Sequence, residues 1–282
     1  MSTKDLKSLK NRIESVLSTT KITKVMKMIA FAKLRSAKEK FFYADNFYEK
    51  LITVIANLDT KKYYKEYIDD KSQEYLYLVF SSNRGLCGSY NSSVQKIVQN
   101  KYNEDIAKGK KISTIFIGNK SAEYFINTRH KITRNFYEVW ENKDPEYYFA
   151  CDILHKVLSL NNFKQVYLFY NRLKTGISFD TVRTTLFACK NDIHDIDSYG
   201  DNTKFMPNKK YLAKDMFLEF LSAKIYTILT SSYAAENVSR MMAMDNATNN
   251  AQEISKDLKK EFNTLRQEKI TNEIMEIISG SE

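Results

Sequence analysis

The sequence predicts an α/β protein that combines a long antiparallel coiled coil of its N- and C-terminal helices with a central, doubly wound, largely parallel α/β domain. Three observations support this prediction. Residues 1–84 and 208–279 contain neither Gly nor Pro, a heptad repeat runs through the first stretch, and short β-branched and aromatic runs alternate with helical segments between the two. We therefore divide the 282 residues into an N-terminal coiled-coil helix (1–60), an α/β domain (61–207) and a C-terminal coiled-coil helix (208–282).

The N-terminal heptad repeat continues through sixteen positions, of which thirteen are apolar and three, Thr20, Thr23 and Lys27, are polar. A 3.5-residue repeat held for so long is typical of a coiled-coil seam. At 1.5 Å per residue such a helix would be roughly 80 Å long, which is more than a compact domain needs. The positions are Leu6, Leu9, Ile13, Val16, Thr20, Thr23, Lys27, Ala30, Leu34, Ala37, Phe41, Ala44, Tyr48, Leu51, Ile55 and Leu58.

The C-terminal stretch has an apolar stripe of its own, at Met244, Ala247, Ala251, Ile254, Leu258, Phe262 and Leu265. Because the two stretches flank one domain, we expect them to pair antiparallel and to bury both stripes together. The small side chains of Ala30, Ala247 and Ala251 would allow close approach. Residues 216–229 are apolar nearly all round, which predicts enclosure by the N-terminal helix and the sheet. An ordinary surface helix or a homodimeric coiled coil is the alternative for each stretch.

Between the two stretches, β-branched and aromatic runs predict strands and the intervening segments predict helices. The expected strands are 76–80, 112–117, 132–139, 166–170 and 177–187, and the expected helices are 91–107, 120–127 and 145–160. Pro145 after Asp144 predicts a helix start with proline in the first turn. A polar stretch with Gly200 and Pro207 then predicts the connection into the last helix.

Net charge is +10, and its distribution is more informative than its size. Twelve basic against five acidic residues give residues 1–58 a charge of +7, whereas residues 236–282 carry −3, so opposite signs favour pairing of the two ends. Nucleic-acid binding by a basic coiled-coil adaptor is one alternative. The aromatic residues of the first helix cluster beyond its basic run and do not interleave with it, and a protein partner with acidic loops explains the charge equally well.

The sequence offers no metal or cofactor site that we would expect to be occupied. Cys87, Cys151 and Cys189 lie far apart, and together with His130, His155 and His194 they make no metal-ligand pattern, which fits a reduced intracellular setting. The richest apolar window, 216–229, is too short and too charged to span a bilayer.

The segment SSNRGLCGSYNSSV (81–94) follows the first expected strand and opens a helix, the place where phosphate-binding loops occur. Gly85 and Gly88 do not have dinucleotide-fingerprint spacing, and no Gly-Lys-Ser/Thr follows. A tight strand-to-helix turn is therefore the favoured interpretation, and Cys87 is expected to be a small buried thiol. Asp180, Asp192, Asp195 and Asp197 are not a convincing acid/base set, so we expect no catalytic residue.

Four segments carry a resemblance that spans nearly the whole chain. RIESVLSTTKITKVMKMIAFAKLRSAK (12–38), SSNRGLCG (81–88), AAENVSRMMAMDNATNNA (234–251) and LRQEKITNEIMEI (265–277) closely resemble the gamma subunit of the rotary F-type ATP synthase. The resemblance implies that the terminal helices form the central shaft inside a ring of alternating alpha and beta subunits. It also implies that the α/β domain projects at the foot, beside the epsilon subunit and the membrane-embedded c ring.

The same resemblance implies the site residues. Lys24, Met26 and Lys27 match a stretch that faces acidic loops of the beta subunits. Residues on the last helix that match further beta-subunit contacts are Arg240, Arg266, Gln267 and Thr271, and the residues similar to the family's shaft tip are Ile270, Ile274, Ile277 and Ile278. A solvated helix face is the alternative reading for these side chains.

The chain departs from the family at Asn83, where Asp is usual, and at FMPN (205–208), where an acidic run is common, so we expect altered contacts with epsilon or the c ring. The cysteine pair of light-regulated members is absent, so thiol control is not expected. No transit peptide precedes the matching N-terminus, which implies a bacterial subunit, peripheral to the cytoplasmic face of the inner membrane.

The implied function is that of a non-catalytic central-stalk rotor subunit, which couples proton-driven rotation of the c ring to conformational cycling of the beta subunits. The alternative is a nucleotide-dependent α/β enzyme with a helical oligomerisation arm.

Overall fold

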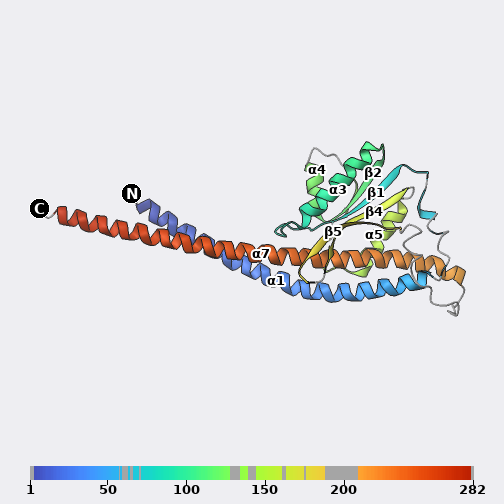
Figure 1. Ribbon diagram of the computed structural model, residues 1–282, viewed down its shortest axis with the longest axis horizontal. Coiled ribbons are helices and arrows are strands. Elements are labelled where there is room, and N and C mark those ends of the chain that lie inside the picture. Colours follow the sequence, from blue (N-terminus) through green and yellow to red (C-terminus); the bar gives the residue numbers. More distant parts are fainter. Residues whose placement is uncertain are drawn as a thin grey trace. The chain divides into compact units, whose positions relative to one another are not determined.

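The structure is a computed structural model, and it describes residues 3–56, 58, 63, 66–69, 71–127, 134–138, 144–160, 163–174, 176–187 and 209–280. The residues group into two compact units, Met1–Phe31 with Arg240–Glu282, and Ala32–Ser239. In chain order the elements are α1 (Thr3–Ala56), β1 (Glu74–Phe80), α3 (Tyr90–Ala107), β2 (Lys111–Ile117), α4 (Asn119–Asn127), β3 (Arg134–Glu138), α5 (Tyr147–Ser159), β4 (Gln165–Leu173), β5 (Phe179–Thr185) and α7 (Lys209–Ser279) (Figure 1).

The larger unit is built on a five-stranded sheet of order β3-β2-β1-β4-β5. Strands β1 to β4 pair in parallel, and β5 pairs with β4 in the antiparallel sense, from Leu173 opposite Phe179 to Tyr167 opposite Thr185. The prediction of a largely parallel, doubly wound sheet is confirmed. The antiparallel edge arises because only a short turn joins β4 to β5, too short for the crossover that a parallel pair requires.

Both faces of the sheet are buried. In β1, Leu76, Leu78 and Phe80 belong to one hydrophobic cluster, while Tyr75 and Tyr77 belong to another. Since successive side chains of a strand point to opposite faces, these clusters lie on the two sides of the sheet. Helices α3 and α4 cover one side, and α5 and α7 cover the other (Figure 1). This double burial explains why β1 is nearly continuously apolar or aromatic.

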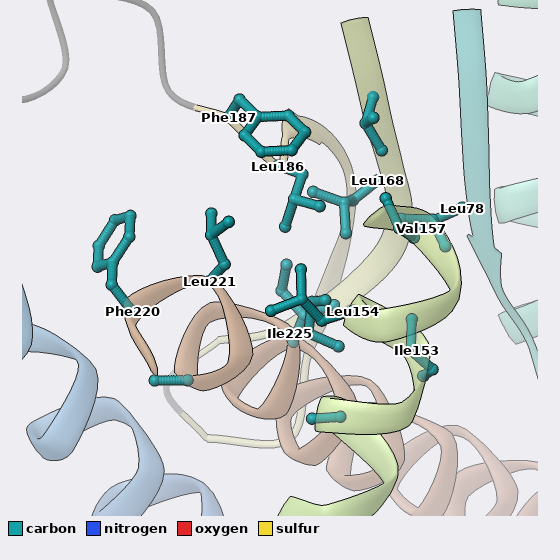
Figure 2. Close-up of a cluster of buried hydrophobic side chains, with 14 of the residues drawn as sticks. Leu78, Ile153, Leu154, Val157, Leu168, Leu186, Phe187, Phe220, Leu221 and Ile225 are labelled. Carbon is teal, nitrogen blue, oxygen red and sulfur yellow. The ribbon is translucent and has the colours of Figure 1, made fainter. Parts of the chain in front are cut away.

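The larger cluster joins α5, α7 and the sheet. Figure 2 shows Leu154 and Val157 of α5 directed toward Leu168 of β4, with Leu221 and Ile225 of α7 beside them. Helix α7 has no exposed residue between 216 and 229. On its far side Phe220 stacks on Tyr48 of α1, with ring centroids 5.3 Å apart, and the Thr227 hydroxyl donates to the Ala44 carbonyl oxygen at 3.2 Å. The predicted enclosure of this segment between the first helix and the sheet is confirmed.

The smaller unit is an antiparallel pair formed by the two chain ends. Thr248 contacts Thr23 and Asp245 contacts Lys27, so residue numbers rise along α7 as they fall along α1. All sixteen heptad positions predicted on the N-terminal stretch are buried or half-buried, although Leu58 lies beyond the end of α1. The heptad therefore identifies the seam of the first helix correctly.

The stripe predicted for the last helix was wrong at Ile254, which is 48% exposed, while its neighbour Ser255 is only 5% exposed. Thr248 is likewise buried where Ala247 is only half-buried. The physical reason is that the buried side follows strict spacings of four and three from Met244, even where these fall on hydroxyl residues. Thr248 tolerates burial because its Oγ1 lies within hydrogen-bond distance of the Met244 carbonyl oxygen, at 2.7 Å.

The predicted start of the third domain helix also needs correction. Helix α5 begins at Tyr147 and its N-cap, Glu146, is extended (φ −112°, ψ 149°), so Pro145 precedes the helix and is not in its first turn. Asp144 does not cap the helix because its carboxylate is engaged elsewhere, accepting from Lys40 Nζ at 3.0 Å and from the Tyr233 hydroxyl at 3.1 Å.

Some predictions fall on other parts of the chain. The connection with Gly200 and Pro207, the FMPN run and Cys189, His130 and His194 lie outside the described residues. The strand predicted over 132–139 is described as β3, Arg134–Glu138.

Candidate partner-binding surfaces

The three candidate residues on α1 lie next to the seam but in different surroundings. Lys24 is exposed, and Met26 is half-buried. Lys27 occupies a seam position and its Nζ lies 2.6 Å from Asp245 Oδ1, with side-chain exposures of 41% and 45%. The structure therefore leaves Lys24 on the outer surface of its unit, whereas Lys27 is held by an ion pair within that unit.

The candidates on α7 are spread along its C-terminal half. Arg240 is half-buried, and Arg266, Gln267 and Thr271 are exposed. The Thr271 hydroxyl donates to the Gln267 backbone carbonyl oxygen at 2.9 Å, a bond within the helix. The structure brings Arg266, Gln267 and Thr271 together on one short stretch, and Arg240 lies seven turns away along the helix at about 3.6 residues per turn.

The predicted tip residues form an exposed apolar end of α7. Every residue from 271 to 280 is exposed, and Ile277 reaches 72%. Solvated helices seldom carry so many large aliphatic side chains, and exposed apolar patches of this kind mark sites of protein interaction. The exposed tip side chains are Ile270, Ile274, Met275, Ile277 and Ile278.

The sequence reasoning missed a second apolar surface on α1. Ile22, Val25 and Ile29 are each about half exposed and lie at spacings of three and four, parallel to the seam but outside it. Met28 and Phe31 extend this exposed surface. The sequence contained a signal for this surface. A helix that buries one stripe can be polar elsewhere, so a second apolar stripe indicates a second binding surface.

The glycine-containing loop between β1 and α3 is a tightly bonded turn, as predicted. The Ser82 hydroxyl lies 3.5 Å from Cys87 Sγ and 2.7 Å from Asn91 Nδ2, and Cys87 is buried. Leu86 has a positive φ of 61°, which is uncommon for a residue other than glycine, and its side chain is exposed. These side chains satisfy one another's hydrogen-bonding groups, as expected of a structural turn.

Asn83, one of the departures from the family pattern, has a clear local role. Its Oδ1 accepts the backbone N–H of Asn119, the first residue of α4, at 3.0 Å. An amide oxygen satisfies this donor as a carboxylate would, although without the charge that favours helix N-termini.

One ionised group ties α1 to the sheet domain within the larger unit. Burial alone would raise the pKa of Asp144, but hydrogen bonds from Lys40 and Tyr233 outweigh it and lower that pKa. The carboxylate therefore remains charged at neutral pH and holds α1 and α7 at one point.

Among the residues that the structure describes, no group of three or more His, Cys, Asp or Glu side chains is arranged to hold a metal ion. In the same residues, no helix is both long enough and apolar enough to cross a membrane.

A family model described as ATP synthase matches residues 5–282. The chain is 32% identical to the ATP synthase gamma chain of Bdellovibrio bacteriovorus over 98% of both chains, and 32% identical to that of Mycoplasma mobile over 99% of this chain and 98% of the relative. The chain belongs to the ATP synthase gamma chain family.

Solved structures agree at the level of the fold. A rotor chain of the Euglena gracilis mitochondrial ATP synthase superposes with a TM-score of 0.71 at 19% identity, covering 95% of this chain and 100% of that one. A chain from a second structure of that enzyme, comprising OSCP, F1 and the c ring, gives a TM-score of 0.76 at 19% identity over 99% of this chain and 94% of that one.

Proposed function

We propose that the chain is the central-stalk rotor subunit of a bacterial proton-translocating ATP synthase. It couples rotation of the membrane c ring to conformational cycling of the catalytic beta subunits and takes no part in the chemical step itself. Its partners are the alpha and beta subunits, the epsilon subunit and the c ring. It acts at the cytoplasmic face of the inner membrane, held there through the complex.

The observation that carries this proposal is the antiparallel pair formed by the two chain ends, with apolar side chains outside its seam. The seam accounts for Ile13, Ala30 and Leu258, which are buried, but not for Ile22, Val25 or the tip isoleucines, which are exposed. A helix pair that is complete within itself and still displays aliphatic side chains is suited to turn against other proteins. Membership of the gamma chain family supplies the identity of those proteins.

The mechanism requires differential contact and no chemistry on this chain. Each beta subunit exchanges among conformations of different nucleotide affinity, and a partner shifts such an equilibrium only by binding one conformation more tightly than another. Driving a two-state equilibrium from 1:99 to 99:1 requires about 5.5 kcal/mol of differential binding. As the shaft rotates, a given beta subunit meets a different face of it, and the contact energy changes accordingly.

Within this function we assign Lys24, Met26, Arg240, Arg266, Gln267 and Thr271 to beta-subunit contacts, and Ile270, Ile274, Ile277 and Ile278 to the tip. We also assign the segments 1–60 and 208–282 to the shaft and 61–207 to the foot. Exposed cationic groups such as Lys24 and Arg266 suit acidic loops of a partner. Met26 adds an adaptable apolar contact beside them.

Co-purification with native mass spectrometry tests the assignment directly. Tagged full-length chain, expressed with the other subunits of its complex, should be recovered in a particle that contains alpha, beta and epsilon subunits with one copy of this chain. Recovery of the chain as a homo-oligomer that binds ATP tightly and stoichiometrically would instead establish a nucleotide-dependent enzyme. Salt-sensitive retention on nucleic acid without beta subunits would likewise contradict the proposal.

A further inference from the structure

The apolar seam of α1 is interrupted at three consecutive heptad positions, Thr20, Thr23 and Lys27. Thr23 is buried and the other two are half-buried, so the interruption belongs to the helix interface and not to its surface. A polar residue at a seam position costs stability compared with an apolar one. A polar residue at these positions therefore needs an explanation other than stabilisation of the helix pair.

Each of two polar positions meets a matching group on α7. The Thr248 and Thr23 hydroxyl oxygens lie 2.8 Å apart, within hydrogen-bond distance, and Lys27 Nζ donates to Asp245 Oδ1 at 2.6 Å. The two contacts are one helical turn apart on both helices and run in the antiparallel sense. They form a continuous polar layer in the pair.

A polar layer specifies which residues face each other. A purely apolar heptad seam can slide by seven residues and still bury apolar groups, because the pattern repeats. Sliding α7 by one heptad would place Val238 or Gln252 where Asp245 now lies, and Lys27 would lose its counter-charge. Fixing the register is also the best-attested use of polar groups at helix interfaces.

We propose that the Lys27–Asp245 ion pair, with the Thr23–Thr248 hydroxyl pair, fixes which residues of α1 and α7 face each other within the smaller unit. Lys27 is then a positioning residue that acts through Asp245, and its effect on partners is indirect. The inference rests on the proposed function in one respect only, that register governs how the shaft presents its faces to the beta subunits. It reassigns Lys27, which the family resemblance implied to be a direct contact.

The first test is a charge-exchange cycle on the isolated full chain. Lys27→Asp places two carboxylates together, and Asp245→Lys places two ammonium groups together, so each single variant should lower the thermal midpoint by roughly 2 to 4 °C. The double variant, Lys27→Asp with Asp245→Lys, restores an ion pair of reversed polarity and should recover most of that loss. Lys260→Asp is the matched control, because the Lys260–Asp257 pair lies in the same unit but is exposed at 71% and 76%.

The second test uses the assembled complex and the ratio of proton pumping to ATP hydrolysis. Each single variant should lose coupling, and the double variant should regain it, because reversed polarity restores the register. If Lys27 touches a beta subunit directly, the reversed charge still faces that partner, and the double variant stays as impaired as Lys27→Asp alone.

Two results would overturn the inference. One is additive midpoint losses in the cycle on the isolated chain, which would mean that the pair has no interaction energy. The other is a double variant that folds like wild type but remains uncoupled. Failure of wild-type chain to join a complex would contradict the proposed function alone, since the first test needs no partner.

Discussion

At the residue scale, the best-defined polar feature is a buried carboxylate at the end of α3. The Asp105 side chain is 0% exposed, and it accepts the Tyr77 hydroxyl at 2.6 Å and the ammonium groups of Lys101 and Lys110 at 2.9 Å each. Lys110 also lies 4.1 Å from the ring centre of Tyr75. These bonds tie the helix to strand β1 and to the turn that leads into β2.

Replacing Asp105 by Ala should lower the free energy of unfolding by about 3 kcal/mol, because two partly buried ammonium groups and a buried hydroxyl each lose a close acceptor. Chemical denaturation of the full chain measures the change. Glu104→Ala is the control: Glu104 is adjacent in sequence and also pairs with Lys101, but at 3.6 Å and with its side chain 61% exposed. That variant should change stability by no more than about 0.5 kcal/mol. Equal losses in the two variants would contradict the buried network.

The same carboxylate makes stability depend on acidity. Burial alone would raise the pKa of Asp105, but hydrogen bonds from Tyr77, Lys110 and Lys101 outweigh it and lower that pKa below its ordinary 3.8. The unfolded chain therefore binds the proton first, so this stabilisation is present above about pH 4 and is lost as the pH falls through the lowered folded value. Denaturation of wild type and Asp105→Ala at a series of pH values should show their difference shrinking below about pH 4.

Replacing Gly118 should be costly. It has a positive φ of 106°, and a Cβ there would lie 2.1 Å from the backbone oxygen of Ser81. Gly118→Ala should therefore lower the free energy of unfolding by at least about 2 kcal/mol, since either the turn after β2 or the end of β1 must move. Gly85→Ala is the control, because no atom lies within 4 Å of its added Cβ. Similar midpoints for the two variants in thermal unfolding would be inconsistent with this geometry.

At the scale of elements, the sequence predicted most of the fold because period and composition agree. The five strands and the first seam were found from patterns alone, since buried strands and sustained heptads are strong local signals. The pattern failed at Ile254 and Ser255, where the search for apolar residues departed from the strict repeat. The helix start predicted at Pro145 was wrong because hydrogen bonds from Lys40 and Tyr233 to Asp144 outweighed the local capping signal. The exposed apolar stripe at Ile22 and Val25 was missed, although its spacing is visible in the sequence, because only the heptad seam was followed.

The corrected seam can be tested by a pair of substitutions on α7. Leu258→Ala should cost about 2 to 3 kcal/mol of stability, because Leu258 is buried at the interface. Ile254→Ala should cost less than about 1 kcal/mol, because Ile254 is half exposed. Thermal unfolding followed by far-ultraviolet circular dichroism compares the two. A larger loss for Ile254→Ala would restore the original stripe.

At the scale of the whole molecule, the proposed function has the two chain ends act on partners, and the central domain connects them along the sequence. The apolar side chains at the C-terminal end of α7 are exposed. In the proposed function this end is held by the surrounding subunits of the complex. Its removal should affect coupling more than folding.

A chain truncated after Leu265 should keep its thermal midpoint but lose coupled ATP synthesis, because it lacks the exposed tip and three proposed contacts, Arg266, Gln267 and Thr271. Synthesis by reconstituted vesicles and unfolding of the isolated chain give the two measurements. A chain truncated after Ser279 is the control, since it keeps all of these residues. Wild-type synthesis by the shorter chain would show that the tip has no part in coupling.

The antiparallel pair also constrains how the protein is made. Thr23 and Thr248 pair although they are 225 residues apart in sequence. A ribosome adding roughly 5 to 20 residues per second therefore completes the paired part of α7 about 10 to 45 seconds after that of α1. During that interval the alanine and leucine side chains of the first helix have no α7 to pack against and are exposed to solvent. The nascent chain therefore depends on other molecules to cover this apolar stripe. When translation is slowed, this protein should aggregate more readily than a protein whose contacts are local in sequence.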